Sequence, residues 1–290
     1  MGIPYAEVIG DPIAHSKSPA IHKFWLAKLG IEADYRARQI TEGELPRYLS
    51  SSRNDPDWRG CNVTVPHKRA VLPFVGRLTP LAERCGAVNA ITFDETGARK
   101  GQNTDALAVT ALLKRFGPTP DPNRVATYVQ IIGAGGAARA AVIGAVDAGY
   151  CDFDFFNRTL AGAQELAVWL SLDPGAYAAP LEGLGPIRNP DDGPNDQRYS
   201  HVVINATCMG MSGQPSVPIE LDRYYPDTIV LDFAYGRGET HLVREARRLD
   251  LRIADGFDIL VEQAAAAFEL FYDALAPREH DAELRELLTS

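Results

Sequence analysis

The run Asn62-Val-Thr-Val-Pro-His-Lys68 places an amine and two polar side chains where they could act on a small substrate. If residues 60–65 form a strand, Asn62 and Thr64 share one face near its C-terminal end, where ligands gather in open α/β sheets. Pro66 ends that strand and suits the first turn of a helix, whose dipole disfavours a protonated amine at Lys68. Such a lysine can exchange a proton near neutral pH, although a lysine after a strand is more often only solvated.

Hydroxyl and carboxylate side chains stand at the starts of two predicted helices. Ser18 falls at the N-cap of a helix over 19–29, so it either caps this helix or, together with Ser16, binds a small carboxylate beside free backbone N–H groups. Asp105 precedes a helix over 106–116, where capping is again a sufficient explanation.

Two amide side chains fall inside apolar segments. Asn89 interrupts an apolar strand over 87–93, and Gln263 lies on the apolar stripe of a helix over 257–275. A buried amide is costly unless it has a hydrogen-bond partner. Asn89 therefore needs a partner, and Gln263 suggests a bound ligand.

A strand, a glycine turn and a helix follow one another in the middle of the chain. Residues 125–132 are apolar and largely β-branched, and the turn Gly133-Ala-Gly-Gly-Ala137 leads into an alanine-rich helix over 139–148. Gly133 permits the tight turn, Gly135 lets the backbone approach a pyrophosphate, and Ala138 lets helix and strand pack closely. This order predicts a dinucleotide site with the phosphates at the helix N-terminus.

The end of the next predicted strand, over 152–156, indicates which dinucleotide binds. A site for NAD usually carries an acidic residue at that tip, whereas a 2′-phosphate requires Arg and small hydrogen-bonding side chains. Asp154 lies inside the strand, and its tip belongs to Asn157 and Arg158, with Thr159 next. The pattern favours NADP; the alternative is that Arg158 is an ordinary solvated arginine.

Composition predicts a cytoplasmic two-domain enzyme. The chain has 290 residues, 46% of them hydrophobic, which is ample for two cores. A net charge of −9 argues against a nucleic-acid partner or an acidic membrane surface. We find no signal-peptide pattern and no apolar run long enough for a membrane helix. The four cysteines lack C-x-x-C spacing, so neither a metal site nor a disulfide framework is expected.

Eight short motifs occur in the order seen in shikimate dehydrogenases, and the sequence resembles that family over nearly its whole length. These motifs are His15-Ser-Lys-Ser-Pro19, Asn62-Val-Thr-Val-Pro-His-Lys68, Gly86-Ala-Val-Asn89, Asn103-Thr-Asp105, Gly133-Ala-Gly-Gly-Ala137, Asn157-Arg-Thr159, Asn205-Ala-Thr207 and Gln263-Ala-Ala265. The resemblance implies NADP-dependent, reversible reduction of 3-dehydroshikimate to shikimate, in the pathway to chorismate and the aromatic amino acids.

The resemblance also implies an α/β fold of two domains with a cleft between them. An open α/β substrate-binding domain is expected over residues 1–104 and a Rossmann-type NADP-binding domain over 105–252. Helices over 253–290 are expected to return to the first domain. The protein is expected to be a monomer or a homodimer.

The same resemblance assigns roles to individual residues. It makes Lys68 and Asp105 the catalytic pair. The substrate-binding residues would be Ser16, Ser18, Thr64, Asn89, Asp105, Tyr235 and Gln263. The cofactor-binding residues would be Gly133, Ala134, Gly135, Gly136, Ala137, Asn157, Arg158, Thr159, Phe233 and Gly256.

The sequence departs from the family pattern at several positions. Ala90 stands where Thr is common, and Ala106 where Gly is common; Gly162 replaces a second basic residue, which weakens the expected NADP preference. Gly236 lies in Tyr235-Gly-Arg-Gly, which replaces a more usual Tyr-Asn-Pro. Two other functions are alternatives: a quinate/shikimate dehydrogenase that uses NAD, and a non-catalytic NADP-binding sensor, which would not need both Lys68 and Asp105.

Overall fold

The computed structural model describes residues 2–52, 54–117, 126–170, 177–186, 199–236 and 238–289. Val125, the first residue of the predicted strand over 125–132, lies outside these ranges. So does the polar segment 189–196, whose Gly, Pro and Asp residues predict a surface loop. The chain divides into two compact units: unit 1 comprises Met1–Leu107 and Leu260–Ser290, and unit 2 comprises Ala108–Ile259. Helices α5 (Thr104–Phe116) and α9 (Gly256–Tyr272) contain the two points at which the chain passes from one unit to the other.

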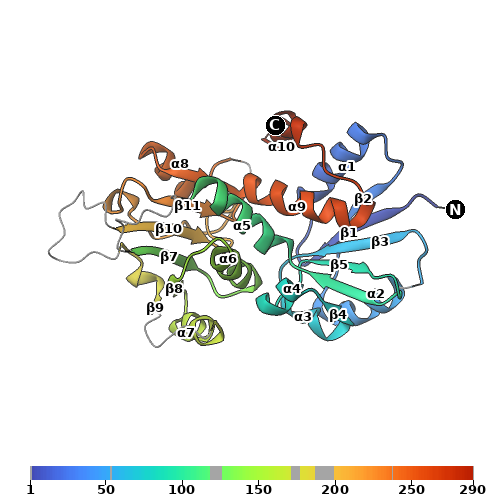
Figure 1. Cartoon of the computed structure of the whole chain (residues 1–290), viewed down its shortest axis with the longest axis horizontal. Helices are drawn as coiled ribbons and strands as arrows, with labels where there is room; N and C mark the ends of the chain where they lie inside the picture. The colour runs from blue at the N-terminus through green and yellow to red at the C-terminus, as the bar shows by residue number, and fades with distance from the viewer. Residues whose placement is uncertain are drawn as a thin grey trace. The chain divides into compact units, whose positions relative to one another are not determined.

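Unit 1 alternates strands and helices, as its sequence pattern predicts, through its first half (Figure 1). Its strands are β1 (Tyr5–Gly10), β2 (Asp34–Gln39), β3 (Trp58–Val63), β4 (Arg77–Leu78), β5 (Ala90–Phe93) and β6 (Arg99–Gln102). Its helices, besides parts of α5 and α9, are α1 (Ser18–Leu29), α2 (Leu45–Ser52), α3 (His67–Ala70), α4 (Pro80–Cys85) and α10 (Asp281–Thr289), with short 3-10 turns at Glu42–Glu44, Leu72–Phe74 and Arg278–His280.

The sheet of unit 1 is mixed. Its order is β2-β1-β3-β5-β6-β4, in which β1 pairs in parallel with β2 and β3, and β5 pairs antiparallel with β3 and β6. Strands β4 and β6, which we did not predict, are short, and β6 is polar. The carboxyl ends of β1 and β3 meet at one edge, because Ile9 lies opposite Val63.

Helix α1 differs from its prediction in two respects. Of the two interpretations of Ser18, the cap is excluded, because the helix begins at Ser18, its N-cap is Lys17, and no side chain caps it. The apolar residues Ile21, Phe24, Trp25 and Leu29 predict the side of α1 that faces the core, whereas Leu29 is exposed and His22 is buried. The His22 ring stacks on Tyr35 of β2, with ring centroids 3.9 Å apart, so the buried side includes position 22.

Unit 2 is built on a second sheet. Its strands are β7 (Ala126–Ile132), β8 (Asp152–Asn157), β9 (Tyr177–Pro180), β10 (Tyr199–Asn205), β11 (Ile229–Asp232) and β12 (Arg252–Ala254). Its helices, besides parts of α5 and α9, are α6 (Gly136–Asp147), α7 (Leu160–Trp169) and α8 (His241–Arg248), with 3-10 turns at Leu181–Gly183 and Leu221–Arg223.

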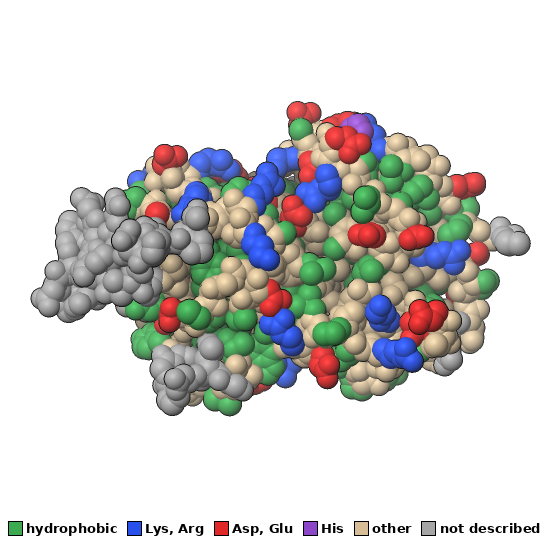
Figure 2. All heavy atoms as spheres, viewed as in Figure 1, with side chains coloured by type: hydrophobic (Ala, Val, Ile, Leu, Met, Phe, Trp, Pro, Cys, Tyr) green, Lys and Arg blue, Asp and Glu red, His purple; other side chains and the backbone are tan. Residues whose placement is uncertain are grey.

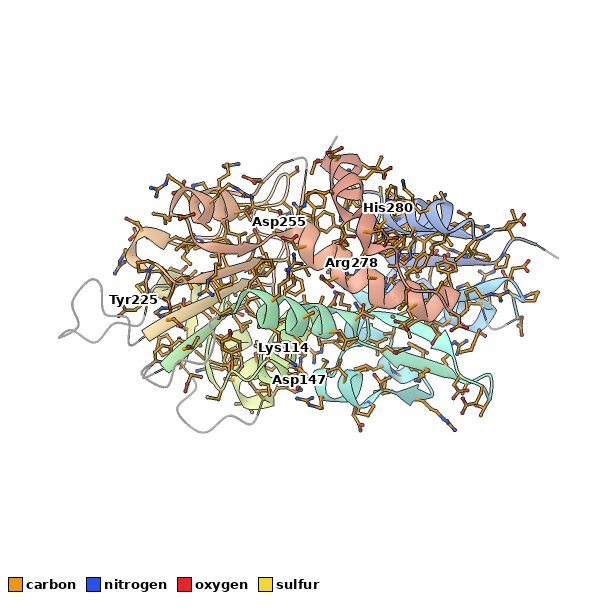
Figure 3. The ribbon with its side chains drawn as sticks, turned by 45° about the horizontal axis from the view of Figure 1, so that its top comes forward. Lys114, Asp147, Tyr225, Asp255, Arg278 and His280 are labelled. Atoms are coloured by element: carbon orange, nitrogen blue, oxygen red, sulfur yellow. The ribbon has the colours of Figure 1, made fainter. Side chains whose placement is uncertain are left out.

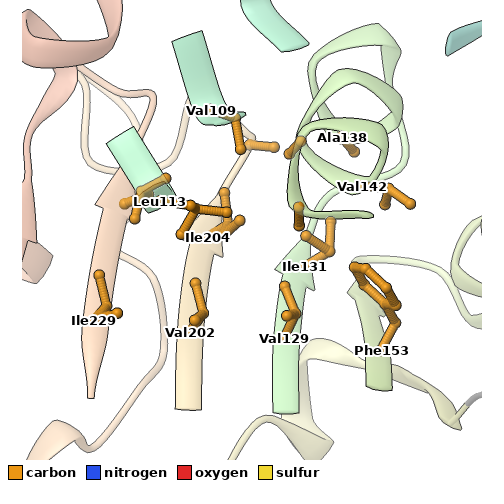
Figure 4. Close-up of a cluster of buried hydrophobic side chains, with 14 of the residues drawn as sticks. Val109, Leu113, Val129, Ile131, Ala138, Val142, Phe153, Val202, Ile204 and Ile229 are labelled. Atoms are coloured by element: carbon orange, nitrogen blue, oxygen red, sulfur yellow. The ribbon is translucent and has the colours of Figure 1, made fainter. Parts of the chain in front are cut away.

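All strand pairs of this second sheet are parallel, in the order β12-β11-β10-β7-β8-β9. Two halves therefore run outwards from β7 and β10, which is the strand order of a dinucleotide-binding sheet. Apolar side chains of α5 and α6 pack on one face of it (Figure 4). They include Val109, Leu113, Ala138 and Val142, and they contact Val129, Ile131, Phe153, Val202, Ile204 and Ile229 of the strands.

Acidic and basic side chains are interspersed on the face of the molecule shown in Figure 2, so the net charge of −9 is not gathered there into one patch. Among the helices of the described ranges, none is long and apolar enough to cross a membrane.

Candidate functional site

An ion pair lies in unit 1 between the two residues that we predicted to be catalytic. The Lys68 ammonium donates to Oδ2 of Asp105 over 2.6 Å, and the side chains are only 13% and 7% exposed. A short, mostly buried pair of this kind has a fixed geometry, because little water competes for either charge. The lysine is therefore not the freely solvated residue of the alternative interpretation.

Local structure corrects our account of how Lys68 and Asp105 are placed. Strand β3 ends at Val63, and Val65 is 66% exposed, so the predicted alternation does not continue to residue 65. Helix α3 has only four residues, which is too short for a strong helix dipole at Lys68. The Asp105 carboxylate is the dominant charge beside the amine.

Asp105 is available for this pair because another residue caps its helix. Helix α5 begins at Thr104, and the Ala106 N–H donates to Oδ1 of Asn103 over 3.0 Å. The Asn103 side chain is held by its own amide, which donates to the Ala87 carbonyl. The alternative in which Asp105 caps the helix is thus excluded, and its carboxylate is left for Lys68.

Thr104 connects the two predicted amides. Its backbone N–H donates to Asn89 Oδ1 over 2.7 Å, and its hydroxyl accepts from Asn89 Nδ2 over 2.9 Å and lies 3.5 Å from Gln263 Oε1. Gln263 also donates to the Leu260 carbonyl. Both amides are buried, and each keeps one N–H that these bonds do not use. We did not single out Thr104, although the polar run Asn103-Thr-Asp105 at a helix start was a usable signal.

The remaining predicted residues of unit 1 lie at the same sheet edge. The Thr64 N–H donates to the Ile9 carbonyl, and a β-carbon at Gly10 would lie 2.5 Å from Thr64 Cγ2, so only glycine fits beside it. The loop from Gly10 leads to Ser16, whose hydroxyl accepts from the Ser18 N–H over 3.3 Å. The backbone N–H of Val88 donates to the Lys68 carbonyl, which ties Lys68 to the segment that precedes β5 and carries Asn89.

The glycine turn of unit 2 fits a bound pyrophosphate. Gly133 has a φ of +113°, which other residues rarely adopt, and a β-carbon there would lie 2.9 Å from Thr207 Cγ2. Gly135 is the N-cap of α6 and no side chain caps that helix, so its first N–H groups remain available to an anion. A β-carbon at Gly135 would meet no atom within 4 Å. Ala134, Gly136 and Ala137 complete this turn.

The tip of β8 carries the residues expected to select the cofactor. Asn157 ends the strand and donates to Thr159, whose hydroxyl caps α7. Arg158 is exposed and forms no ion pair within the described part of the chain, which leaves its guanidinium available to a phosphate. Asp154 is buried inside the strand, where burial raises its pKa to about 7. An ionised carboxylate is therefore not offered to a ribose at this tip.

Phe233, Tyr235 and Gly256 lie in unit 2 near the carboxyl end of β11. The Phe233 N–H donates to the Asn205 carbonyl over 2.9 Å, and the Tyr235 ring contacts that of Phe257. A β-carbon at Gly256 would lie 2.3 Å from the Ala234 carbonyl oxygen, so the backbone itself requires glycine there. Sequence reasoning missed Asp232, a buried carboxylate at this end whose pKa burial raises to about 6.

The departures from the family pattern are accommodated locally. Ala90 and Ala106 are fully buried, and Ala106 still donates to the Asn103 cap. Gly162 lies where a β-carbon would be 2.3 Å from Asn157 Nδ2, so a larger residue would displace that amide. Gly236 follows Tyr235 in a segment without regular structure. No group of three metal-ligating side chains occurs among the residues that the structure describes.

Comparisons with known proteins agree with this geometry. The family model for the shikimate dehydrogenase substrate binding domain matches residues 8–91. The shikimate dehydrogenase (NADP(+)) of Sphingopyxis alaskensis is 38% identical over 287 residues, which cover 99% of this chain and 97% of that protein. The chain belongs to the shikimate dehydrogenase family. A second shikimate dehydrogenase (NADP(+)), from Methylobacterium radiotolerans, is 37% identical and covers 93% of this chain and 91% of its own length.

A solved structure shares the fold across the whole shikimate dehydrogenase chain. The shikimate 5-dehydrogenase of Thermus thermophilus, in complex with NADP(H) and shikimate, matches with a TM-score of 0.79 and 31% identity. The match covers 99% of this chain and 100% of that one. The predicted α/β fold with a Rossmann-type domain is confirmed.

Proposed function

We propose that this chain catalyses the NADP-dependent, reversible reduction of 3-dehydroshikimate to shikimate, a step in the route to chorismate and the aromatic amino acids. The buried Lys68–Asp105 ion pair is the observation that carries the proposal, because a nucleotide-binding sensor has no need of it. The relatives named as shikimate dehydrogenases support the choice of substrate and of NADP.

In the proposed reaction, Lys68 is the proton donor. NADPH, when bound, supplies a hydride to the ketone carbon. The ketone oxygen gains negative charge as its carbon is reduced, and the Lys68 ammonium transfers a proton to it, so that a hydroxyl forms. The lysine then recovers a proton from water. Asp105 holds the amine in place over 2.6 Å and is also proposed to accept a hydrogen bond from a substrate hydroxyl.

Uncharged groups are proposed to hold the rest of the substrate. Ser16 and Ser18 would donate to its carboxylate, and Thr64 would contact the ring. The N–H groups of Asn89 and Gln263 that are not used by Thr104 or Leu260 would donate to ring hydroxyls. A substrate that lacks such a hydroxyl would leave these groups unpaired, which penalises it. Tyr235, in unit 2, is assigned to the substrate by resemblance and stays a prediction.

We propose that NADP is held entirely by groups of unit 2. The turn from Gly133 to Ala137 would bind the pyrophosphate, and Asn157, Arg158 and Thr159 would surround the 2′-phosphate. Phe233 and Gly256 are proposed to lie on the nicotinamide side.

The test is NADPH oxidation on addition of 3-dehydroshikimate, with wild type, Lys68→Ala and Lys114→Ala side by side. Lys114 is an exposed lysine of α5, so its variant loses the same charge away from the ion pair. We expect kcat of Lys68→Ala to fall at least about 100-fold, which is the usual contribution of a general acid, and Lys114→Ala to match wild type. Full activity of Lys68→Ala would refute the proposed role. Comparing kcat/KM for shikimate and quinate, each with NADP and NAD, distinguishes the proposal from a quinate/shikimate dehydrogenase.

A further inference from the structure

Asp232, the last residue of β11, is fully buried and accepts three hydrogen bonds in unit 2. Its Oδ1 accepts from Asn205 Nδ2 over 2.8 Å and from the Ala234 N–H over 3.0 Å. Its Oδ2 accepts from the Thr240 hydroxyl over 2.6 Å. Burial of a carboxylate is costly, and these three donors offset that cost.

Each donor belongs to a different segment. Asn205 ends β10, and its amide also binds the Met209 carbonyl and the Thr207 hydroxyl, so it shapes the loop over 206–210. Ala234 lies in the segment that follows β11. Thr240 caps α8 by accepting from the Val243 N–H. One carboxylate therefore joins a loop, a strand end and a helix start.

These segments lie at the carboxyl ends of β10 and β11. Dinucleotides bind across the point where the strand order reverses, which in this sheet is between β7 and β10. Since the glycine turn and the tip of β8 serve the adenosine half, the ends of β10 and β11 face the nicotinamide half. The loop over 206–210 also contacts the turn directly, because a β-carbon at Gly133 would lie 2.9 Å from Thr207 Cγ2.

We infer that Asp232 is a positioning residue, which holds the loop over 206–210 and the segment after β11 in the conformation that receives the nicotinamide half of NADP. This inference rests on the proposed function, since it assumes the same cofactor. A carboxylate is needed because three donors converge on two acceptor atoms. An amide offers only one acceptor atom, so Asp232→Asn would turn an N–H group towards the Thr240 hydroxyl or towards Asn205 and Ala234.

The experiment measures the affinity of Asp232→Asn for two probes by titration: NADPH and adenosine 2′,5′-bisphosphate, which lacks the nicotinamide half. We expect the dissociation constant for NADPH to rise about tenfold, in line with the loss of one hydrogen bond to a charged group. The constant for the bisphosphate should stay within about twofold, because the glycine turn and the tip of β8 are unchanged. Asp222→Asn, which neutralises an exposed carboxylate, is the matched control and should bind both probes like wild type.

Thr240 provides a second test of the same network. Thr240→Ser keeps the hydroxyl and should retain wild-type NADPH affinity, whereas Thr240→Val should follow Asp232→Asn. If Asp232→Asn binds NADPH like wild type, or loses affinity for both probes equally, the inference is wrong. Because these measurements need no turnover, a wild type that binds NADPH but does not reduce 3-dehydroshikimate would refute the proposed function alone.

Discussion

A β-carbon at Gly256 would collide with the Ala234 carbonyl oxygen at 2.3 Å, whereas one at Gly135 would meet no atom within 4 Å. The glycine-turn pattern assigns Gly135 to the cofactor and the family resemblance assigns Gly256, but the physical reasons for glycine differ. At Gly256 the protein backbone occupies the space, so the residue is required by folding. At Gly135 the space is open, and its φ of −84° is accessible to any residue, so only a bound ligand would require glycine there.

We therefore predict opposite effects of the two alanine variants. Gly135→Ala should keep its free energy of unfolding within about 1 kcal/mol of wild type. No atom is displaced, and the lower conformational entropy of the unfolded Ala chain offsets the loss of a better N-cap residue. Its dissociation constant for NADPH should rise about tenfold or more. Gly256→Ala should lose about 2 kcal/mol or more of stability, because the backbone near Ala234 must move.

Urea unfolding and NADPH titration of the two variants would check this prediction. A Gly135→Ala protein that binds NADPH normally would show that the pyrophosphate does not approach the backbone at residue 135. A Gly256→Ala protein as stable as wild type would show that the contact with Ala234 relaxes without cost.

One arginine, Arg278, connects the start of α10, the C-terminal helix of unit 1, to α9 through hydrogen bonds. The Arg278 guanidinium forms two parallel 3.0 Å hydrogen bonds to the Glu262 carboxylate and one of 2.8 Å to Asp281, at the start of α10. Arg278 lies beside α9 in Figure 3. Glu262 directly precedes Gln263 in α9. The pair of hydrogen bonds between Arg278 and Glu262 therefore also holds in place the helical turn that carries the buried Gln263 amide.

We predict that Arg278→Ala lowers the free energy of unfolding by about 2 kcal/mol, because it leaves the half-buried Glu262 carboxylate without its bidentate partner. Amide hydrogens of α10 should exchange faster in the variant. The control is Arg223→Ala, which removes an exposed ion pair with Glu220 and should change stability by less than about 0.5 kcal/mol. Equal losses of unfolding free energy in Arg278→Ala and Arg223→Ala would contradict the stabilising role assigned to the Arg278–Glu262 ion pair.

Elements with strong periodicity could be predicted from sequence, and those set by distant partners could not. The apolar run of β7 and the alanine-rich α6 are stabilised mainly by burial, which the local pattern reports. The polar strand β6 pairs with β5, and the two-residue strand β4 pairs with β6; no local pattern shows these pairings. The burial of His22 likewise depends on Tyr35, thirteen residues later in the chain.

The candidate site likewise has residues that the sequence predicted and contacts that it did not. Residue types and motif order pointed to Lys68 and Asp105, and the structure brings them to 2.6 Å. Motif order did not reveal that Asn103 is the helix cap or that Thr104 joins Asn89 to Gln263, because these are contacts between segments. Asp232 was missed for the same reason, since a carboxylate at the end of an apolar strand has an ordinary pattern.

The cores of the two units contain buried ionisable groups whose shifted pKa values change the stability of the whole protein with pH in opposite directions. In unit 1, burial lowers the pKa of His22 from 6.5 to about 3, and neither ring nitrogen has a hydrogen-bond partner among the described residues. In unit 2, burial raises the pKa of Asp154 from 3.8 to about 7. Asp232, whose pKa is raised to about 6, acts in the same direction as Asp154 over a lower pH range.

The signs follow from the protons bound in each state. At about pH 5.5 the unfolded chain carries a proton on His22 and the folded protein does not. Raising the pH to about 8 removes that proton from the unfolded chain, so His22 makes the fold more stable as pH rises. Asp154 binds a proton only when folded, so this group makes the fold less stable as pH rises through about 7. At about 1.4 kcal/mol per pKa unit, raising the pH from about 5.5 to about 8 changes the free energy of unfolding by about +1.4 kcal/mol through His22 and by about −2 kcal/mol through Asp154.

We predict that His22→Phe and Asp154→Asn change the pH dependence of stability in opposite ways, measured as the free energy of unfolding in urea at about pH 5.5 and about pH 8. His22→Phe keeps a flat ring against Tyr35 and removes the term that favours high pH, so its stability should fall more steeply than that of wild type as pH rises. Asp154→Asn removes the opposing term, so its stability should fall less or increase. Parallel pH profiles for wild type and both variants would mean that neither buried group changes its protonation on unfolding. A difference in slope for one variant alone would assign the pH response to the core of that unit.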